Sequence, residues 1–341
     1  MGRSFRRAAA LAAALAGLWS AYWLLAARGI EGGARSWLEQ RAEQGWLAEY
    51  SDIGTDGYPL RFETRLRGLR LADPRAGLAW EAPRFRFHAP SYRPNRITAV
   101  WPETQLLATP LQKIAVASDA MEAGLRFRPG RALALDALTA RLEGLRLDSS
   151  LGWSAGLEAG RLTLRRVDDE TADNLHFYEM VFRASRLRPS GGVLRWLDPS
   201  GSLPDSFDSF RLEARLGFDA PWDRFAIERR RPQPRLLQLQ EASAHWGRLR
   251  LRFAGALEVD ERGIPDGRIE VRATGWREIL RLAVDTGLVS GHLLPTLERA
   301  FEFLASASGS PDTLEAPLIF RDGRLSFGPI PLGPAPRLRL R

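Results

Sequence analysis

The N-terminal region contains an unbroken apolar stretch. No charged side chain occurs between Ala8 and Ala27. An α-helix of that length is about 30 Å long, which matches the hydrocarbon core of a bilayer. Its N-terminal flank carries three arginines, and this excess of positive charge favours a cytoplasmic N-terminus: Arg3, Arg6 and Arg7. The pattern predicts a transmembrane anchor over residues 1–29, with the bulk of the chain exported.

A cleaved signal peptide is the alternative to an anchor. Alanine inserts weakly into membranes, which favours a signal sequence. The apolar stretch is, however, longer than an ordinary signal core, and no Ala-x-Ala pair follows its end. Trp19, Tyr22 and Trp23 lie three and four residues apart near the far end, where aromatic rings prefer the membrane interface. We therefore expect an anchor.

After the anchor, the pattern is first helical and then alternating. Ile30, Ala34 and Trp37 are spaced as on one helix face, and we expect a juxtamembrane helix over residues 30–48. From Tyr58 onward apolar residues occupy every second position, which predicts a strand with one apolar and one polar face.

Two strand pairs resemble each other. Arg65-Leu-Arg-Gly-Leu-Arg-Leu71 recurs as Arg141-Leu-Glu-Gly-Leu-Arg-Leu147, and a turn and a second alternating strand follow each copy. A hairpin used twice predicts an antiparallel meander. Further strands are predicted at residues 97–101, 112–117, 125–127, 177–187, 210–218, 236–239, 248–257 and 268–273.

The last third of the chain combines helices and strands. Apolar stripes predict helices at residues 276–285 and 293–305, and Asp322-Gly323 predicts a tight hairpin turn. The fold class we expect is α+β and β-rich, with a transmembrane helix followed by a curved antiparallel meander on which two C-terminal helices pack. Residues 188–209, rich in Gly, Ser and Pro, predict a loop boundary between two β halves, 49–187 and 210–341.

Several segments resemble a bacterial family catalogued as domain of unknown function 2125. The similar segments are Gly57-Tyr-Pro-Leu-Arg-Phe62, Ala89-Pro-Ser-Tyr-Arg-Pro-Asn95, residues 254–268 running into Gly275-Trp276, and the proline-rich residues 328–336. The resemblance implies a membrane-anchored envelope protein without an established activity, and it implies no catalytic or binding residues. Repeated β units after one anchor are also similar in architecture to AsmA-like envelope proteins, which are tied to lipid handling.

The net charge of +8 does not by itself indicate nucleic-acid binding. Lys113 is the only lysine among 49 basic residues, and the arginines alternate singly with apolar residues, as in Arg248–Phe253. No dense basic block or nucleic-acid motif occurs, so we expect no nucleic-acid partner and assign the charge to anionic lipid headgroups. The absence of cysteine excludes disulfides, thiolate metal sites and cysteine nucleophiles.

One motif suggests catalysis. Gly152-Trp-Ser-Ala-Gly156 matches the Gly-x-Ser-x-Gly pattern, in which a strand-to-helix turn exposes a nucleophilic serine, here Ser154. Partners could come from Asp169 or Glu179 with a histidine: His176, His245 or His292. The residues after Gly156 alternate as in a strand, so we expect a strand–turn–strand unit rather than a catalytic elbow.

No metal or cofactor site is predicted. The four histidines, His88, His176, His245 and His292, have no metal-ligand spacing. The acidic residues 168–170 could attract a hard cation but lack a calcium-loop pattern, so a solvated loop is expected.

The functional expectation is therefore non-enzymatic. We expect a single-pass inner-membrane protein, with its bulk in the periplasm, that binds lipid or another apolar ligand along the sheet. The alternatives are a scaffold that binds an envelope protein partner and a serine esterase that uses Ser154.

Overall fold

The computed structural model of the protein describes residues 2–168, 174–228, 230–286, 290–307, 310–328 and 330–340. The chain divides into two compact units. Unit 1 comprises residues 1–126 and 149–151, and unit 2 comprises residues 127–148 and 152–341. This division differs from the predicted boundary at 188–209, because the strands on either side of that segment, β11 (His176–Leu187) and β12 (Phe207–Phe218), pair directly in one sheet.

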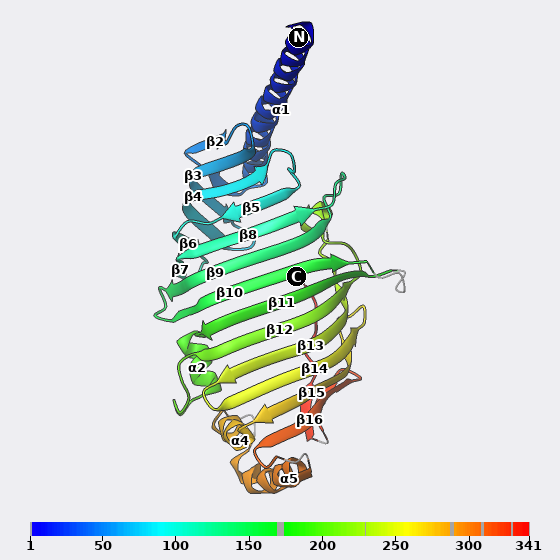
Figure 1. The fold of residues 1–341 in the computed structure, drawn as a ribbon. Helices are drawn as coiled ribbons and strands as arrows, with labels where there is room; N and C mark the ends of the chain where they lie inside the picture. Colours follow the sequence, from blue (N-terminus) through cyan, green and yellow to red (C-terminus); the bar gives the residue numbers. More distant parts are fainter. Residues whose placement is uncertain are drawn as a thin grey trace. The chain divides into compact units, whose positions relative to one another are not determined.

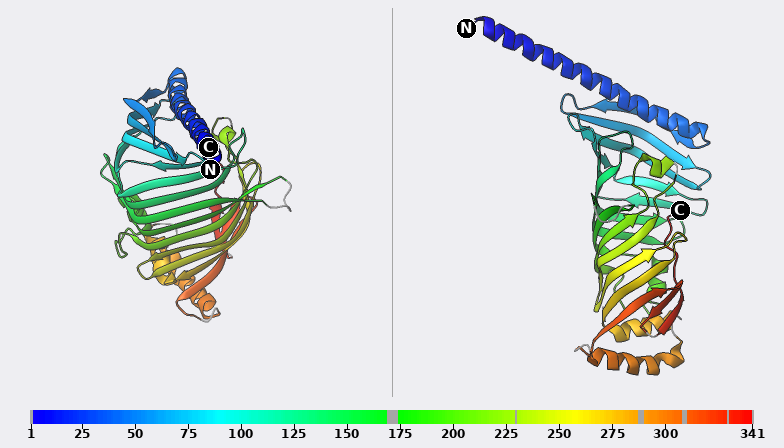
Figure 2. Two further views of the ribbon diagram at one scale, coloured as in Figure 1. Left: turned by 45° about the horizontal axis from the view of Figure 1, so that its top comes forward. Right: turned by 90° about the vertical axis from the view of Figure 1, so that its right-hand side faces the viewer.

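Unit 1 begins with one long helix, α1 (Gly2–Glu43), drawn in dark blue in Figure 1. The prediction of a separate juxtamembrane helix over 30–48 is corrected, since no break occurs at residues 29–30 and the helix ends at Glu43. No proline interrupts it, and Ala34 and Leu38 continue to pack against the unit-1 sheet. The N-terminal half of α1 projects beyond that sheet (Figure 2). By length and composition it could cross a membrane, and a signal sequence would meet the same two criteria.

The unit-1 sheet is antiparallel and is organised around its two longest strands, β3 (Arg61–Asp73) and β4 (Leu78–Pro90), which pair along their length. β1 (Leu47–Glu49) and β2 (Asp52–Asp56) pair with β3. β5 (Arg96–Val100) and β6 (Thr104–Ala108) pair with β4, while β7 (Lys113–Ala117) pairs with β6 and β8 (Ala120–Phe127) with β5.

Unit 2 is an antiparallel meander in which each strand pairs with the next along the chain, as expected. Figures 1 and 2 show that this sheet is curved. Its strands are β9 (Leu135–Ser149), β10 (Ser154–Val167), β11 (His176–Leu187), β12 (Phe207–Phe218), β13 (Pro234–Trp246), β14 (Leu249–Val259), β15 (Pro265–Thr274), β16 (Thr313–Arg321), β17 (Arg324–Phe327) and β18 (Ile330–Pro334).

The repeated heptapeptide contains a glycine that changes the phase of its strand. Gly68 in β3 has φ +60, and Gly144 in β9 has φ +55, both in the left-handed region. Leu66 and Leu69 are consequently both buried, although they are three residues apart and would otherwise point to opposite faces. In each copy of the repeat, the residues that face the core therefore change from one alternate set to the other at the glycine.

The two faces of the unit-2 sheet differ in chemistry. Opposed residues in an antiparallel pair lie on the same face. On one face, arginines and glutamates from neighbouring strands pair as Arg165–Glu179 at 2.9 Å, Arg183–Glu213 at 3.3 Å and Arg272–Glu315 at 2.8 Å. These three pairs place arginines of the polar face in cross-strand contacts, which contribute little each at exposed positions.

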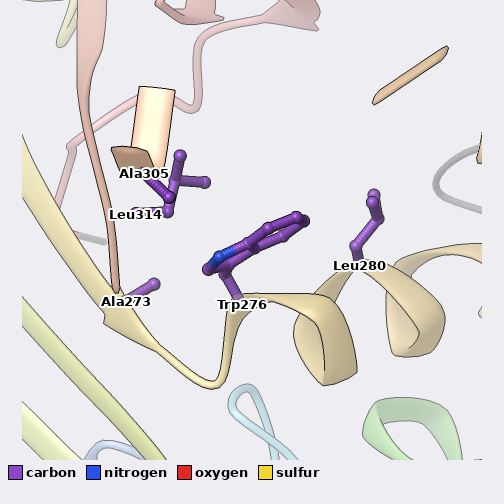
Figure 3. Packing of buried hydrophobic residues seen from close by; sticks show 5 residues of the cluster. All are labelled: Ala273, Trp276, Leu280, Ala305 and Leu314. Carbon is purple, nitrogen blue, oxygen red and sulfur yellow. The ribbon is translucent and has the colours of Figure 1, made fainter. Parts of the chain in front are cut away.

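The two C-terminal helices pack on one end of the unit-2 sheet, as predicted. α4 (Trp276–Asp285) and α5 (Leu294–Ala307) enclose Trp276, which is 1% exposed (Figure 3). The cluster that they form with the sheet also contains Ala273, Leu280, Ala305 and Leu314. The indole N–H of Trp276 donates to the Pro311 carbonyl at 3.1 Å, which satisfies its polar atom.

The other connections are more structured than their composition predicts. The segment 188–209 contains α2 (Gly191–Leu197), followed by a turn around the carboxylate of Asp198. That buried carboxylate accepts hydrogen bonds from Ser200 Oγ at 2.8 Å and from the Leu203 N–H at 2.7 Å. The remaining short helices are α3 (Arg224–Glu228) and the 3-10 turn η1 (Gly291–Leu293).

The Asp322-Gly323 turn is confirmed, since both residues have positive φ, at 53 and 71. The proline-rich tail forms β18 and pairs with β17. The side chains of Ala335 and Leu338 then pack against the cluster of Leu257 and Ile269.

Candidate functional site

An apolar pocket of about 330 Å³ lies in unit 1 between α1 and the sheet. α1 contributes one wall, β3 a second and β4 a third. The lining residues are Ile30, Ala34, Trp37, Leu38, Leu66, Leu69, Leu71, Trp80, Phe85 and Phe87. All are apolar or aromatic, and the volume falls at the lower end of the range of small-molecule sites.

Local sequence patterns produce the walls. Ile30, Ala34 and Leu38 recur every four residues and therefore share one side of α1. On β3, the left-handed Gly68 brings Leu66 and Leu69 to the same face of the sheet. The pocket thus depends on the phase switch in the repeated heptapeptide.

The β4 wall is aromatic. The ring centroids of Trp80 and Phe85 are 5.6 Å apart in an edge-to-face arrangement, and those of Phe85 and Phe87 are 6.4 Å apart. The Trp80 N–H donates to Gln105 Oε1 at 2.6 Å. Because this bond satisfies the polar atom of the indole, the ring can present an apolar surface to the pocket. Trp37 on the helix is 42% exposed, so the pocket is open to its surroundings.

Two charged groups adjacent in sequence to the helical wall, Glu31 and Arg35, are held by other partners. Arg35 contacts Glu31 at 3.4 Å and donates to the Ile53 carbonyl at 3.2 Å. The Glu31 carboxylate also accepts the Thr55 N–H at 2.7 Å. No ionisable side chain lines the pocket, so its chemistry suits binding of an apolar group rather than acid–base or nucleophilic catalysis.

Unit 2 carries an apolar sheet face of its own. Residues that share this face on β10 to β14 are aligned by the strand register and are partly exposed: Leu162, Leu164, Met180, Phe182, Leu212, Leu216, Leu237, Leu239, Leu251 and Phe253. At one end, residues of α2 and α4 pack with Trp246 and Leu249. At the other end, Tyr178 is fully buried and its hydroxyl accepts the Trp222 N–H at 3.0 Å.

Ser154 lies in the context that its alternating neighbours predict. It is exposed at the start of β10 and pairs with Asp148 on β9, so no helix follows the turn. His176 lies at the opposite end of the ladder, about 40 Å along β10. His245 is on β13, three strands or about 14 Å across the sheet. Neither histidine is within reach of the Ser154 hydroxyl.

Glu179 also lies far from Ser154 along the strand ladder. Glu179 is opposite Arg165, at the far part of β10, and forms an ion pair with it. His292 lies in η1. Asp169 lies outside the described residues.

The acidic segment holds one described carboxylate with a clear role. Asp168 accepts a hydrogen bond from Arg128 at 2.6 Å, and this bond lowers the pKa of Asp168 below its ordinary value. Asp169 and Glu170 lie outside the described residues. Among the described ranges, no group of three or more His, Asp or Glu side chains is arranged to hold a metal ion.

Sequence reasoning did not identify the pocket, although it placed Ile30, Ala34 and Trp37 on one helix face. The tryptophans of unit 2 differ in exposure. Trp246 and Trp276 are buried in unit 2, whereas Trp196 is 56% exposed. The sequence signal that could have indicated the pocket is an apolar helix face directly after the anchor, combined with a strand rich in aromatic residues.

The comparisons with known proteins agree with the family resemblance. No curated protein and no solved structure matches the chain. A family model described as "Uncharacterized protein conserved in bacteria (DUF2125)" matches residues 23–336. Its match begins at Trp23, inside the apolar stretch, and extends almost to the end of the chain. The protein therefore belongs to the bacterial DUF2125 family.

Proposed function

We propose that the protein is a single-pass inner-membrane protein, with its bulk in the periplasm, that holds an acyl chain of a lipid in the unit-1 pocket. The observation that carries the proposal is the wholly apolar lining of a pocket whose helical wall continues the apolar N-terminal stretch. Ile30 is three residues beyond Ala27, about 5 Å along the helix, so the pocket begins close to the end of the proposed span.

The packing of α1 supports a retained anchor rather than a cleaved signal. Trp23 and Ala27, inside the apolar stretch, are 6% and 5% exposed and pack with Phe62 of β3. The Trp23 N–H donates to the Arg61 carbonyl at 3.0 Å. Cleavage after the apolar stretch would remove residues that cover the core of unit 1. The arginines at the N-terminus favour a cytoplasmic start and an exported remainder.

The unit-2 sheet supports the same proposal independently. Its apolar face keeps many large side chains partly exposed, which is typical of surfaces that meet an apolar ligand or partner. An acyl chain is the ligand class that matches both the pocket, whose lining has no charged side chain, and the row of large apolar side chains on this face.

A photoreactive lipid tests the proposal. Full-length protein in vesicles is exposed to phosphatidylethanolamine bearing a diazirine on its acyl chain, and the labelled peptides are identified by mass spectrometry. We expect adducts on the α1, β3 and β4 peptides that line the pocket. Adducts confined to the N-terminal half of α1 would overturn the pocket as a lipid site.

A matched pair of variants sharpens the test. Ala34→Phe fills the pocket, while Ser36→Phe adds the same ring at an exposed position of α1. Labelling of the β4 peptide should be lost in the first variant and kept in the second. Equal labelling in two variants with unchanged thermal unfolding would contradict the assignment.

A further inference from the structure

Two neighbouring loops of unit 1 expose large apolar side chains. The first loop connects β2 to β3 and exposes Tyr58 (55%) and Leu60 (67%). The second connects β4 to β5 and exposes Tyr92 (63%). The loops are joined by hydrogen bonds from Ser91, whose N–H donates to the Leu60 carbonyl at 2.9 Å. We call the exposed residues Tyr58, Leu60, Tyr92, Arg93 and Arg96 the loop patch.

The loop patch is fixed to α1 beside the end of its exposed apolar part. The Trp19 N–H donates to the Pro59 carbonyl at 3.1 Å, and the Tyr22 hydroxyl donates to the Ser91 carbonyl at 2.9 Å. The Ser20 and Tyr58 hydroxyls are 2.7 Å apart. Both loops are therefore at the level of residues 19–23 of the helix.

Helix length places this level at the membrane surface. From Ala8 to Tyr22, α1 spans only about 22 Å, shorter than the hydrocarbon core of about 30 Å. The charge-free stretch continues to Ala27, but Trp23 and Ala27 are covered by unit 1. A bilayer that covers the whole charge-free stretch must therefore also contact the loops beside residues 19–23, because these loops lie at the same level as that part of the helix.

The direction of β3 agrees with this placement. Trp23 packs with Phe62, and Leu38 packs with Leu69. These pairs are separated by about 22 Å along the helix and about 23 Å along the strand, so α1 and β3 run side by side. The loop end of β3 is thus directed toward the proposed membrane, and its other end, at Asp73, away from it.

The composition of the loop patch is that of a membrane interface. Tyrosines combine an apolar ring with a polar tip, which suits the headgroup level. Arg93 and Arg96 are exposed, and the Arg93 guanidinium lies 5.8 Å from the centroid of the Tyr92 ring. No acidic residue occurs between Ala89 and Pro102, so the segment is purely cationic.

We infer that the loop patch docks into the outer headgroup region of the same membrane that α1 crosses, with Tyr58, Leu60 and Tyr92 inserted and Arg93 and Arg96 against anionic headgroups. The inference rests on the proposed anchoring of α1. Unit 1 is then attached to the bilayer at two places, one spanning and one interfacial.

Single-cysteine labelling of the full-length protein tests the inference, since the chain has no cysteine of its own. An environment-sensitive fluorophore is attached to Leu60→Cys or Tyr92→Cys in vesicles of phosphatidylcholine and phosphatidylglycerol. Leu111→Cys is the matched control, because Leu111 is 83% exposed and lies near the opposite end of the β3–β4 hairpin. Leu15→Cys reports on the span itself.

We expect blue-shifted emission and quenching by brominated lipid at positions 15, 60 and 92, and aqueous emission at position 111. Aqueous emission at 60 and 92 with a buried label at 15 would overturn docking and leave the anchor intact. An aqueous label at 15 would instead refute the anchoring proposal. The two failures are thereby distinguished.

The contact of Arg93 and Arg96 with anionic headgroups is tested separately, by the emission of the label at position 60. In Arg93→Gln/Arg96→Gln, the blue shift of the label at position 60 should shrink in vesicles with phosphatidylglycerol. The same loss should follow from high salt, which screens headgroup attraction. A shift that is unchanged by the double variant, by salt and by removal of phosphatidylglycerol would overturn the headgroup contact.

Discussion

The effect of replacing Trp23 by alanine should distinguish between two interpretations of α1, a helix that is retained as part of unit 1 and a signal segment that is cleaved off. Trp23 is 6% exposed, its ring stacks on Phe62 with centroids 5.6 Å apart, and it meets Tyr58 edge-to-face at 5.5 Å. Its N–H also donates to the Arg61 carbonyl. Truncating a buried tryptophan typically reduces the free energy of unfolding by about 3 to 5 kcal/mol, which includes the cavity that remains.

The assay is thermal unfolding of the full-length protein in mild detergent, followed by hydrogen exchange of the β3 amides. For a unit of this size, that loss corresponds to a fall in Tm of about 10 °C or more. Leu25→Ala is the control, because Leu25 is on the same helix, two residues away, and is 69% exposed. Its effect should stay within about 0.5 kcal/mol.

An intermediate variant resolves the contributions. Trp23→Phe keeps an aromatic ring but removes the N–H donor, so we expect a loss of about 1 kcal/mol from the hydrogen bond and a further loss from the smaller ring. Equal unfolding temperatures for Trp23→Ala and Leu25→Ala would refute the reasoning. In that case the end of the apolar stretch would not be part of unit 1, and a cleaved signal would become the better interpretation.

Three further predictions concern the fold. Gly68→Ala should destabilise unit 1 by about 1 to 2 kcal/mol in denaturant unfolding, because a Cβ in the left-handed region would also meet the Ser51 side chain at 2.9 Å; Gly54→Ala, with open space around it, should be neutral or stabilising. Gly156→Ala should markedly lower the Tm of unit 2, because its Cβ would lie against the Leu145 carbonyl oxygen, and an unchanged Tm would contradict this. Burial alone would raise the pKa of Asp198, but its hydrogen bonds outweigh burial and lower it; its stabilising effect is therefore present above the ordinary carboxyl pKa of about 3.9 and is lost as the pH falls through the lowered value. Asp198→Ala should reduce stability by about 2 kcal/mol at neutral pH and remove that acid-dependent loss, as measured by urea unfolding at several pH values.

Much of the architecture follows from local patterns. The alternation around Leu251 and Ile269 predicted β14 and β15, and the stripe around Trp276 predicted α4, because one-sided burial determines the period of apolar residues. Short elements were missed where the local pattern is weak. β6, for example, has only five residues.

The repeated heptapeptide shows a different limit. The similarity of the two copies is evident in the sequence, but the role of the glycine is not. The left-handed conformation of Gly68 explains why Leu66 and Leu69 are both buried, and only the structure shows both facts. A strict period of two would have placed one of these leucines in solvent. Gly68, where the alternation of β3 is interrupted, is therefore the position that determines which leucines face the core.

The candidate pocket could not be predicted because it depends on contacts between distant parts of the chain. Ala34 and Phe87 are far apart in sequence, and nothing local indicates that they face each other. The boundary near residue 126 was missed for a similar reason. The Gly- and Pro-rich composition of 188–209 suggested a linker, whereas the pairing of β11 with β12 makes that segment an excursion within one sheet.

The continuity of α1 has a mechanical consequence. α1 runs as one helix without proline from Gly2 to Glu43, but Gly29, Gly32 and Gly33, where a helix bends most easily, lie directly before the packed residues Ala34 and Leu38. A tilt or rotation of the N-terminal half therefore reaches that side of the cavity to the extent that the helix stays straight at these three glycines. If the N-terminal half spans a bilayer, as proposed, these glycines determine how much of a tilt forced by bilayer thickness changes the orientation of the cavity.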